Sequence, residues 1–207
     1  MNPIPILFFI LLVIITLQAN QSHAGSVTND NDLINKACDH ALYKEFCKAS
    51  LLSAPGSKQA NLSGLDIIEL KLALSNASNI NQFINGLLKN TSNDPFVRQC
   101  LEDCSENYQD AIDQLNNSLA ALGSERYNDV NTWVSAAMTD ADSCEDGFKE
   151  KPGHVSPLTS RNTMFSHLCS NVLAITNVLA GIEPHDAIPP LMRKWTPDEY
   201  RDIGIKT

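Results

Sequence analysis

The chain has 207 residues, 43% of them hydrophobic, and a formal net charge of -9 at pH 7. A chain of this length favours one main domain that buries its own core. The acidic charge argues against polyanionic partners such as nucleic acid or de-esterified pectin, because surfaces of like charge repel each other before they dock. A basic or neutral protein partner fits better.

Residues 1–24 are predicted to be a signal peptide. The apolar run from Ile4 to Leu17 is too short to span a bilayer comfortably, and small residues stand at Ser22 and Ala24, where signal peptidase requires them. We therefore expect cleavage after Ala24, secretion to the extracellular space, and no membrane association of the mature chain. The missing basic residue before the run leaves an uncleaved membrane anchor as the alternative.

Two short segments of helical character come next, at residues 33–38 and 41–50. Isolated helices of this length are marginal in water. A disulfide from Cys38 to Cys47 would join them into a small helical hairpin over residues 30–58.

Four longer blocks follow, in which apolar residues recur at helical intervals. Before the second block, Asp94 can cap the helix and Pro95 tolerates its first position. Before the third, Gly123 ends a helix and Ser124 can cap the next one. The Pro-Gly pair at residues 152–153 precedes the fourth. The apolar periods run over about residues 62–89, 97–122 and 127–148 and, after a short loop at residues 153–159, over residues 165–179, with the last helix closing at Gly181.

The first of these helices is predicted to bury a broad face, because two apolar stripes run side by side. One contains Leu65, Ile68, Leu72, Asn79, Phe83 and Leu87, and the other contains Ile67, Leu70, Leu74, Ala77 and Ile84.

Four long amphipathic helices with short connections should pack up-down-up-down. The predicted fold class is therefore all-α, with an N-terminal helical hairpin before a four-helix bundle over residues 62–181. Prolines follow at positions 184, 189, 190 and 197, so we expect residues 182–207 to be an extended or mobile tail.

Six cysteines in an exported chain of this size indicate disulfides. Cys104 stands near the start of the second bundle helix and Cys144 near the end of the third, and antiparallel neighbours place these ends side by side. A bridge there closes a loop of about forty residues, worth roughly 4 kcal/mol on the chain-entropy model. Cys100 and Cys169 flank apolar stripes and are either buried thiols or a third bridge, which their diagonal helices disfavour.

A metal site is not expected. Cys38 and Cys47 lie too far apart for a zinc knuckle, and no pair of histidines stands at ligand spacing. Cys100 and Cys104 have helical spacing but lack a second pair of the same kind. The sequence likewise calls for no cofactor.

Sequons of the form Asn-x-Ser/Thr agree with the secretory route and could carry glycans on exposed surfaces. Such triplets also arise by chance. They begin at Asn61, Asn76, Asn90 and Asn116.

Several stretches carry a recognisable pattern: the spacing from Cys38 to Cys47, residues 104–111 (CSENYQDA), residues 140–148 (DADSCEDGF) and residues 169–175 (CSNVLAI). Over about residues 30–181 they resemble the plant invertase and pectin methylesterase inhibitor family. Residues 149–158 (KEKPGHVSPL) are similar to a branch often labelled "putative invertase inhibitor". The resemblance implies a four-helix bundle with a helical hairpin, and disulfides Cys38–Cys47 and Cys104–Cys144. It implies that Cys169 is unpaired, while Cys100 departs from the common pattern.

The resemblance also implies a function: inhibition of a plant cell-wall carbohydrate enzyme in the apoplast, in a 1:1 complex that covers the substrate cleft. Pectin methylesterase is preferred, because the Pro-Lys-Phe signature typical of invertase inhibitors is absent; acid invertase is the alternative target. By analogy, the outward faces of the second and third bundle helices touch the enzyme. The candidates are Gln109, Asp113, Asn116, Asn117, Asn128, Thr132, Ser135 and Thr139. A glycan on Asn116 would argue against that face.

Other classes of function find less support. Asp140, Asp142, Glu145 and Asp146 cluster near Cys144, but no base, nucleophile and orienting group converge by spacing, so we expect no catalysis. A helical carrier of a small apolar ligand would need a cavity of several hundred cubic ångströms.

The histidines at positions 154 and 167 could tune affinity between acidic and neutral pH, although surface or capping roles are the simpler reading.

Overall fold

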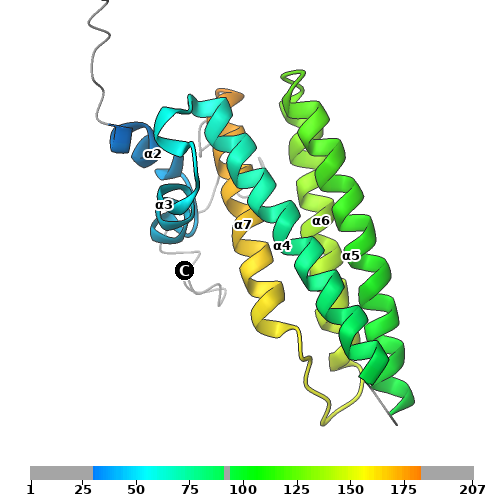
Figure 1. The fold of residues 1–207 in the computed structure, drawn as a ribbon. Helices are drawn as coiled ribbons and strands as arrows, with labels where there is room; N and C mark the ends of the chain where they lie inside the picture. The colour runs from blue at the N-terminus through cyan, green and yellow to red at the C-terminus, as the bar shows by residue number, and fades with distance from the viewer. Residues whose placement is uncertain (1–29, 91–93, 183–207) are drawn as a thin grey trace, which may run out of the picture.

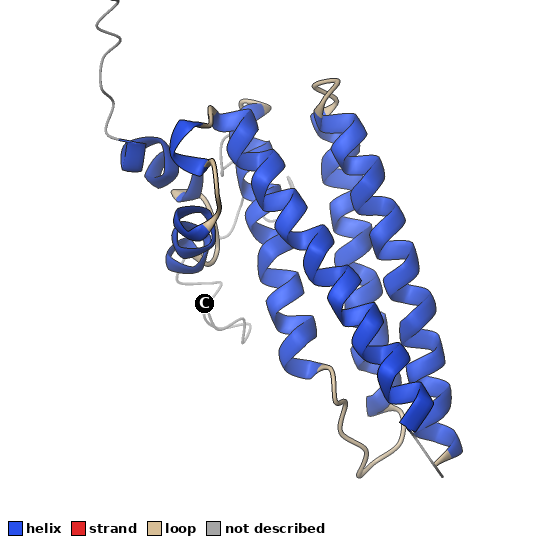
Figure 2. Ribbon diagram, viewed as in Figure 1, coloured by secondary structure: helices blue, strands red, loops and turns tan. Residues whose placement is uncertain are grey.

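The computed structural model describes residues 30–90 and 94–182, so the predicted signal peptide and nearly all of the predicted tail lie outside the described residues. Six α-helices and one short 3₁₀-helix, with no strand, make up this part of the chain (Figure 2). The predicted all-α fold class is confirmed. Within the same ranges, no helix is long and apolar enough to cross a membrane.

The chain forms a hairpin and then a bundle. The hairpin consists of α2 (Asp30–Cys38) and α3 (Lys44–Ser53), followed by the 3₁₀-helix η1 (Ser57–Gln59). The bundle consists of α4 (Leu62–Asn90), α5 (Pro95–Leu122), α6 (Tyr127–Lys149) and α7 (Thr159–Leu179). Each bundle helix packs against the next, and α7 packs back on α4, while the hairpin lies against α4 and α7 (Figure 1).

The predicted start of α5 is confirmed. Asp94 is its N-cap, with Oδ1 accepting hydrogen bonds from the backbone N–H groups of Phe96 at 2.9 Å and Val97 at 3.4 Å. Pro95 occupies the first helical position, where its missing N–H costs nothing.

The predicted cap of α6 is wrong. The Ser124 hydroxyl donates to the Ala120 carbonyl at 3.2 Å instead, and α6 begins only at Tyr127. The turn needs more residues than Gly123 and Ser124, because Glu125 adopts a left-handed conformation with φ 55° before α6 can start.

The helix α3 begins and ends three residues later than predicted. The Ala41 N–H donates to the Cys38 carbonyl at 3.1 Å in a turn, so the helix restarts only after Tyr43. A disulfide joins Cys38 to Cys47, with their Cα atoms 5.7 Å apart. The Tyr43 ring lies 3.6 Å from the ring centre of His167 on α7, and this contact holds the hairpin against the bundle.

The buried stripe of α4 also differs from the prediction. Asn79 is exposed, and Phe83 and Leu87 are only partly buried. The hairpin covers part of α4 in addition to α5 and α7, so its buried face is wider than the apolar pattern alone indicates. The fully buried apolar side chains are Leu65, Leu70, Ala73, Ala77, Ile80 and Ile84.

A second disulfide joins Cys104 of α5 to Cys144 of α6, with their Cα atoms 4.6 Å apart. Both disulfides pair the residues that the family resemblance implies. Cys100 and Cys169 are buried free thiols, and burial raises the pKa of each. Their helices, α5 and α7, are diagonal in the bundle, which explains why no third bridge forms.

Two carboxyl groups that were not predicted to lie in the interior are completely buried. Asp66 and Glu69 on α4 are each 0% exposed. The Thr176 hydroxyl of α7 donates to Asp66 Oδ2 at 2.7 Å, and the Asn171 amide of α7 donates to Glu69 Oε1 at 2.6 Å. Burial raises the pKa of Asp66 to about 8 and that of Glu69 to about 7.

The hydrogen bonds around Glu69 fit a neutral acid. Ser50 Oγ lies 2.9 Å from both Glu69 oxygens and 2.8 Å from the Cys47 carbonyl oxygen. A hydroxyl has one hydrogen, and a carbonyl can only accept. If Ser50 donates to Cys47, a protonated Glu69 can donate to Ser50, and every contact is satisfied. This chain of bonds links the hairpin to α4 and, through Asn171, to α7.

We predict that the free energy of unfolding decreases as the pH rises from about 5 to about 8. In the unfolded chain both carboxyls ionise near pH 4, whereas the folded protein keeps their protons until about pH 7 to 8. The native state therefore binds more protons in this range, and stability is lost as the pH rises. Burial of Glu69 alone should contribute on the order of 2–3 kcal/mol. Urea unfolding at pH 5, 6.5 and 8 measures the decrease.

The variant Glu69→Gln preserves the shape of the neutral acid but cannot ionise. It should lose less stability between pH 5 and pH 8 than the unsubstituted protein. The matched control is Glu106→Gln, which removes an exposed carboxylate on α5 and should leave the slope unchanged. Equal slopes for Glu69→Gln and the unsubstituted protein would contradict the assignment.

Candidate binding surface

The outward faces of α5 and α6 lie side by side along one half of the bundle (Figure 1). All the interface residues predicted from the sequence are exposed in the structure. Thr132 and Thr139 donate their hydroxyls to the carbonyls of Asn128 and Ser135 on their own helix, at 2.8 Å and 3.0 Å. Short side chains held in this way lose little conformational freedom when a partner binds.

The predicted residues of α5 do not all face the same way. The Ser105 hydroxyl donates to Asn81 of α4 at 3.1 Å, so this stripe of α5 faces α4. Gln109 and Asn116 follow Ser105 at four and eleven residues, which places them on the same flank. A glycan on Asn116 would therefore lie towards α4 and leave Asp113 free beside α6.

Sequence reasoning missed Trp133 and the polar seam between α5 and α6. Trp133 on α6 is 39% exposed, which makes it a large apolar side chain on an otherwise polar face. Two turns further on, Asp140 lies partly buried beside Gln114 and Asp110 of α5, and its Oδ2 has no hydrogen-bond partner. Burial, and then the charge of Asp110, raises the pKa of Asp140. The tryptophan itself is the only signal that the sequence could have offered here, because the exposure of a side chain cannot be read from the sequence.

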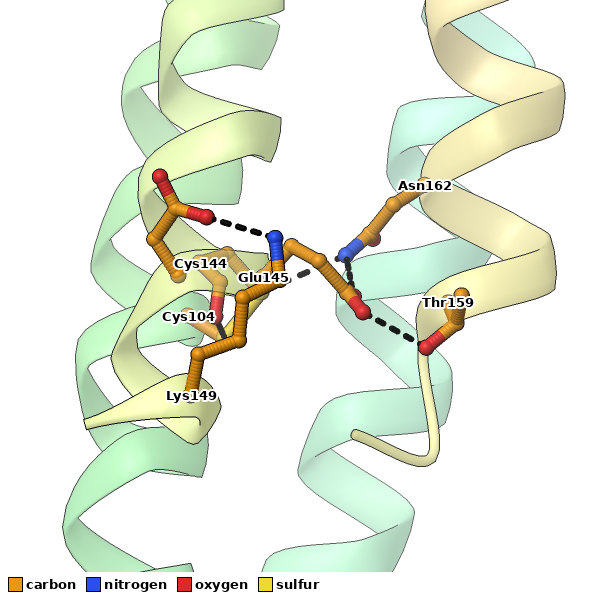
Figure 3. Close-up of polar contacts among 7 residues, drawn as sticks. Cys104, Cys144, Glu145, Lys149, Thr159 and Asn162 are labelled. Atoms are coloured by element: carbon orange, nitrogen blue, oxygen red, sulfur yellow. Dashed lines mark hydrogen bonds and ion pairs between the residues drawn. A yellow bond between two sulfur atoms is a disulfide. The ribbon is translucent and has the colours of Figure 1, made fainter. Parts of the chain in front are cut away.

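A polar network joins three helices at the end of this surface; it is buried at Tyr108 and Asn162 and exposed at Thr159, and Figure 3 shows its links between α6 and α7. Glu145 of α6 accepts hydrogen bonds from the Thr159 hydroxyl at 2.6 Å and the Asn162 amide at 2.8 Å, both on α7. Asn162 Oδ1 in turn accepts from the buried Tyr108 hydroxyl of α5 at 2.8 Å. The Cys104–Cys144 disulfide lies beside this network. Glu145 is therefore a structural link between helices.

His154 and His167 both take part in packing, and the contact of His167 with Tyr43 is described above. His154 Nε2 lies 2.9 Å from Asp94 Oδ2, and this bond lowers the pKa of the Asp94 carboxyl. The His154 ring packs edge-on against Phe96. The contact ties the loop before α7 to the N-cap of α5.

The sequons occupy different environments. Asn61 is exposed, and its Oδ1 accepts a hydrogen bond from the Gly64 N–H at 2.8 Å at the start of α4. Asn116 is exposed on α5. Asn76 lines a cleft between α3, α4 and α7, and its Oδ1 is buried. The side chain of Asn90 lies outside what the structure describes. Glycosylation stays a prediction, and Asn61 and Asn116 offer it the most open positions.

The clefts of the described chain lie on its surface. One of them, about 480 Å³, is lined by residues 125–129 with Ala180 and Ile182. Another, about 240 Å³, lies between Tyr43 and the polar side chains around Glu145. The bundle interior is filled by Tyr108, Phe148 and Phe165, each at most 1% exposed. This packing does not favour the carrier of an apolar ligand.

Fold and surface together define a class: a disulfide-linked helical bundle with a rigid, polar outer face suited to contact with another macromolecule. A family model described as "Plant invertase/pectin methylesterase inhibitor" matches residues 32–175. The chain therefore belongs to the plant invertase/pectin methylesterase inhibitor family, a family of enzyme inhibitors.

Individual relatives agree. Over 137 residues the chain is 41% identical to a "Putative invertase inhibitor" of Platanus acerifolia, covering 66% of this chain and 76% of that protein. Over 175 residues it is 35% identical to a "Pectinesterase inhibitor" of Actinidia deliciosa, covering 84% and 94%. The crystal structure of a mutant form of a pectin methylesterase inhibitor from Arabidopsis aligns with a TM-score of 0.60 and 26% identity, covering 70% and 95%.

We predict that Asn162→Ala destabilises the bundle by about 2–3 kcal/mol, because it leaves the Tyr108 hydroxyl buried without a partner and removes a donor from Glu145. Tyr108→Phe is the control, since it removes only the hydroxyl and should cost about 1 kcal/mol. Urea unfolding at pH 6 measures both. If Asn162→Ala costs no more than Tyr108→Phe, the network does not link the helices as described.

Proposed function

We propose that this protein is a secreted inhibitor of pectin methylesterase, which covers the enzyme's substrate cleft with the outward faces of α5 and α6 in a 1:1 complex. Family membership supports an inhibitor, and relatives named as pectinesterase inhibitors include one that aligns with 84% of the chain. The predicted signal peptide and the sequons support action in the plant cell wall.

The observation that carries the proposal is the α5–α6 face itself. The shorter helix, α6, has 23 residues, so the paired helices present a strip about 35 Å long and about 20 Å wide. Such a strip offers about 700 Å², close to the roughly 800 Å² per partner of a standard interface. The Cys104–Cys144 bond holds the two helices in place before binding, which reduces the entropy lost on association.

Acid invertase is the second candidate target. The 41% identity to the Platanus protein favours it, because that relative is named as an invertase inhibitor. A 30% identical relative from Arabidopsis is named "Cell wall / vacuolar inhibitor of fructosidase 2". The geometry of the bundle serves either target.

The decisive experiment mixes the mature protein, residues 25–207, with purified pectin methylesterase and with acid invertase. Methanol release and sucrose hydrolysis are followed between pH 5 and 7. We expect loss of esterase activity at a molar ratio near one, with invertase unaffected. Retention of both activities at micromolar protein would refute the proposed function.

Thr132→Arg tests the face. An arginine on this face should raise the inhibition constant about tenfold or more, because it blocks close contact. The matched control is Thr163→Arg on α7: like Thr132, Thr163 is exposed and donates its hydroxyl four residues back, to the Thr159 carbonyl at 2.9 Å. Equal loss in both variants would move the interface away from α5 and α6.

A further inference from the structure

The charges of the bundle are divided between its two halves. The helix α5 carries five acidic residues and one arginine, and α6 carries five acidic residues and one lysine. The helix α4 has only the buried Asp66 and Glu69 as acids, with Lys71 and Lys89 outside. The helix α7 has no acidic residue and one arginine. Nearly all of the acidic residues on the surface of the four bundle helices therefore belong to α5 and α6.

The carboxylates at the centre of α5 have no counter-charge. Glu106, Asp110 and Asp113 are exposed, and none forms an ion pair with a residue in the described ranges. No lysine or arginine occurs between Arg98 and Arg126. Within residues 30–90 and 94–182, no ion pair neutralises the negative charge at the centre of α5.

The folding of α5 gains nothing from this arrangement. Glu102, Glu106 and Asp110 follow one another at four-residue intervals, and Asp113 comes three residues later. Like charges at these spacings meet on the helix surface and destabilise it by a few tenths of a kcal/mol per pair. The face also pushes Asp140 towards its neutral form, since the Asp110 charge raises the pKa of that partly buried group. A binding role accounts for charges that stability does not.

We propose that the α5–α6 face is a polyanion-like docking surface, which fits the basic substrate cleft of an enzyme that acts on an anionic polysaccharide. The proposal rests on the proposed function and narrows the target. Hydrolysis of methyl-esterified polygalacturonate leaves carboxylates in the cleft of the esterase, so that cleft must accommodate a polyanion. A cleft for sucrose, which is neutral, has no such requirement.

Charge complementarity is the argument for this occupant. Opposite potentials steer encounter and raise the association rate, most strongly at low salt. The same negative charge repels free de-esterified pectin, so the polymer of the wall would not sequester the inhibitor. Trp133, exposed on α6, supplies a large apolar side chain of the kind that often anchors a polar interface.

The test is a triple variant, Glu106→Gln, Asp110→Asn and Asp113→Asn. Its dissociation constant for pectin methylesterase should rise about tenfold or more at 50 mM NaCl, and the difference should shrink at 500 mM NaCl as salt screens the charges. Added polygalacturonate should displace the unsubstituted protein from the enzyme. Thermal unfolding should show no loss of stability, because like-charge repulsion in α5 is removed.

The matched control removes the same number of carboxylates from the hairpin, with Asp32→Asn, Asp39→Asn and Glu45→Gln, all of them exposed. Its dissociation constant should stay within about twofold of the unsubstituted value, because the hairpin lies against α4 and α7 and not on the α5–α6 face. Loss of exposed ion pairs in the hairpin should also cost little stability. Equal weakening in both triple variants would overturn the proposal, because net charge and not the face would then be responsible. Unchanged binding of the α5 variant would overturn it as well.

Two further outcomes separate the proposal from the proposed function. Inhibition of the esterase together with unchanged binding of the α5 triple variant would overturn the polyanion-like surface and leave the proposed function standing. Inhibition of neither enzyme would overturn both.

Discussion

The pairing of α5 with α6 is the constraint on which the rest of the molecule depends. Both helices carry a net negative charge, and their seam brings Asp110 close to Asp140, so electrostatics oppose the contact. The Cys104–Cys144 bond closes a loop of 40 residues and offsets that repulsion. It also sets the relative positions of the two helices, which fixes the shape of the acidic face before any partner arrives.

Helix positions could be predicted from the sequence because local signals determine them. The apolar period and the Asp94-Pro95 start gave the order and approximate extent of the four bundle helices, and the start of α5 is confirmed. Local signals failed where two of them competed. Ser124 was predicted to be the N-cap of α6, but the turn continues through Glu125. Likewise, α3 begins only after the turn that follows Cys38. Nothing in a short stretch of sequence says how long such a turn will be.

The interior polar groups could not be predicted, because their partners lie far away in sequence. Glu69 accepts a hydrogen bond from Asn171, 102 residues later, and Asp66 accepts one from Thr176, 110 residues later. From the sequence alone, a carboxylate on an amphipathic helix is predicted to face solvent, because the distant residue that would bind it in the interior is not known. The link from Tyr108 through Asn162 to Glu145 has the same character. By contrast, every predicted interface residue is exposed, since polar residues at helical spacing opposite a core stripe face outward.

The two buried acids have to be protonated in the folded molecule, whereas the many exposed acids have to be ionised for the surface to be charged. Carboxyls in water ordinarily ionise near pH 4, whereas Asp66 and Glu69 keep their protons until about pH 8 and 7. Between these limits the core is neutral and the surface is charged. Below them the face would lose its charge, and above them the hydrogen bonds that join the hairpin to α4 and α7 would contain a buried anion. A mildly acidic medium is therefore the condition under which the fold and its charged face coexist.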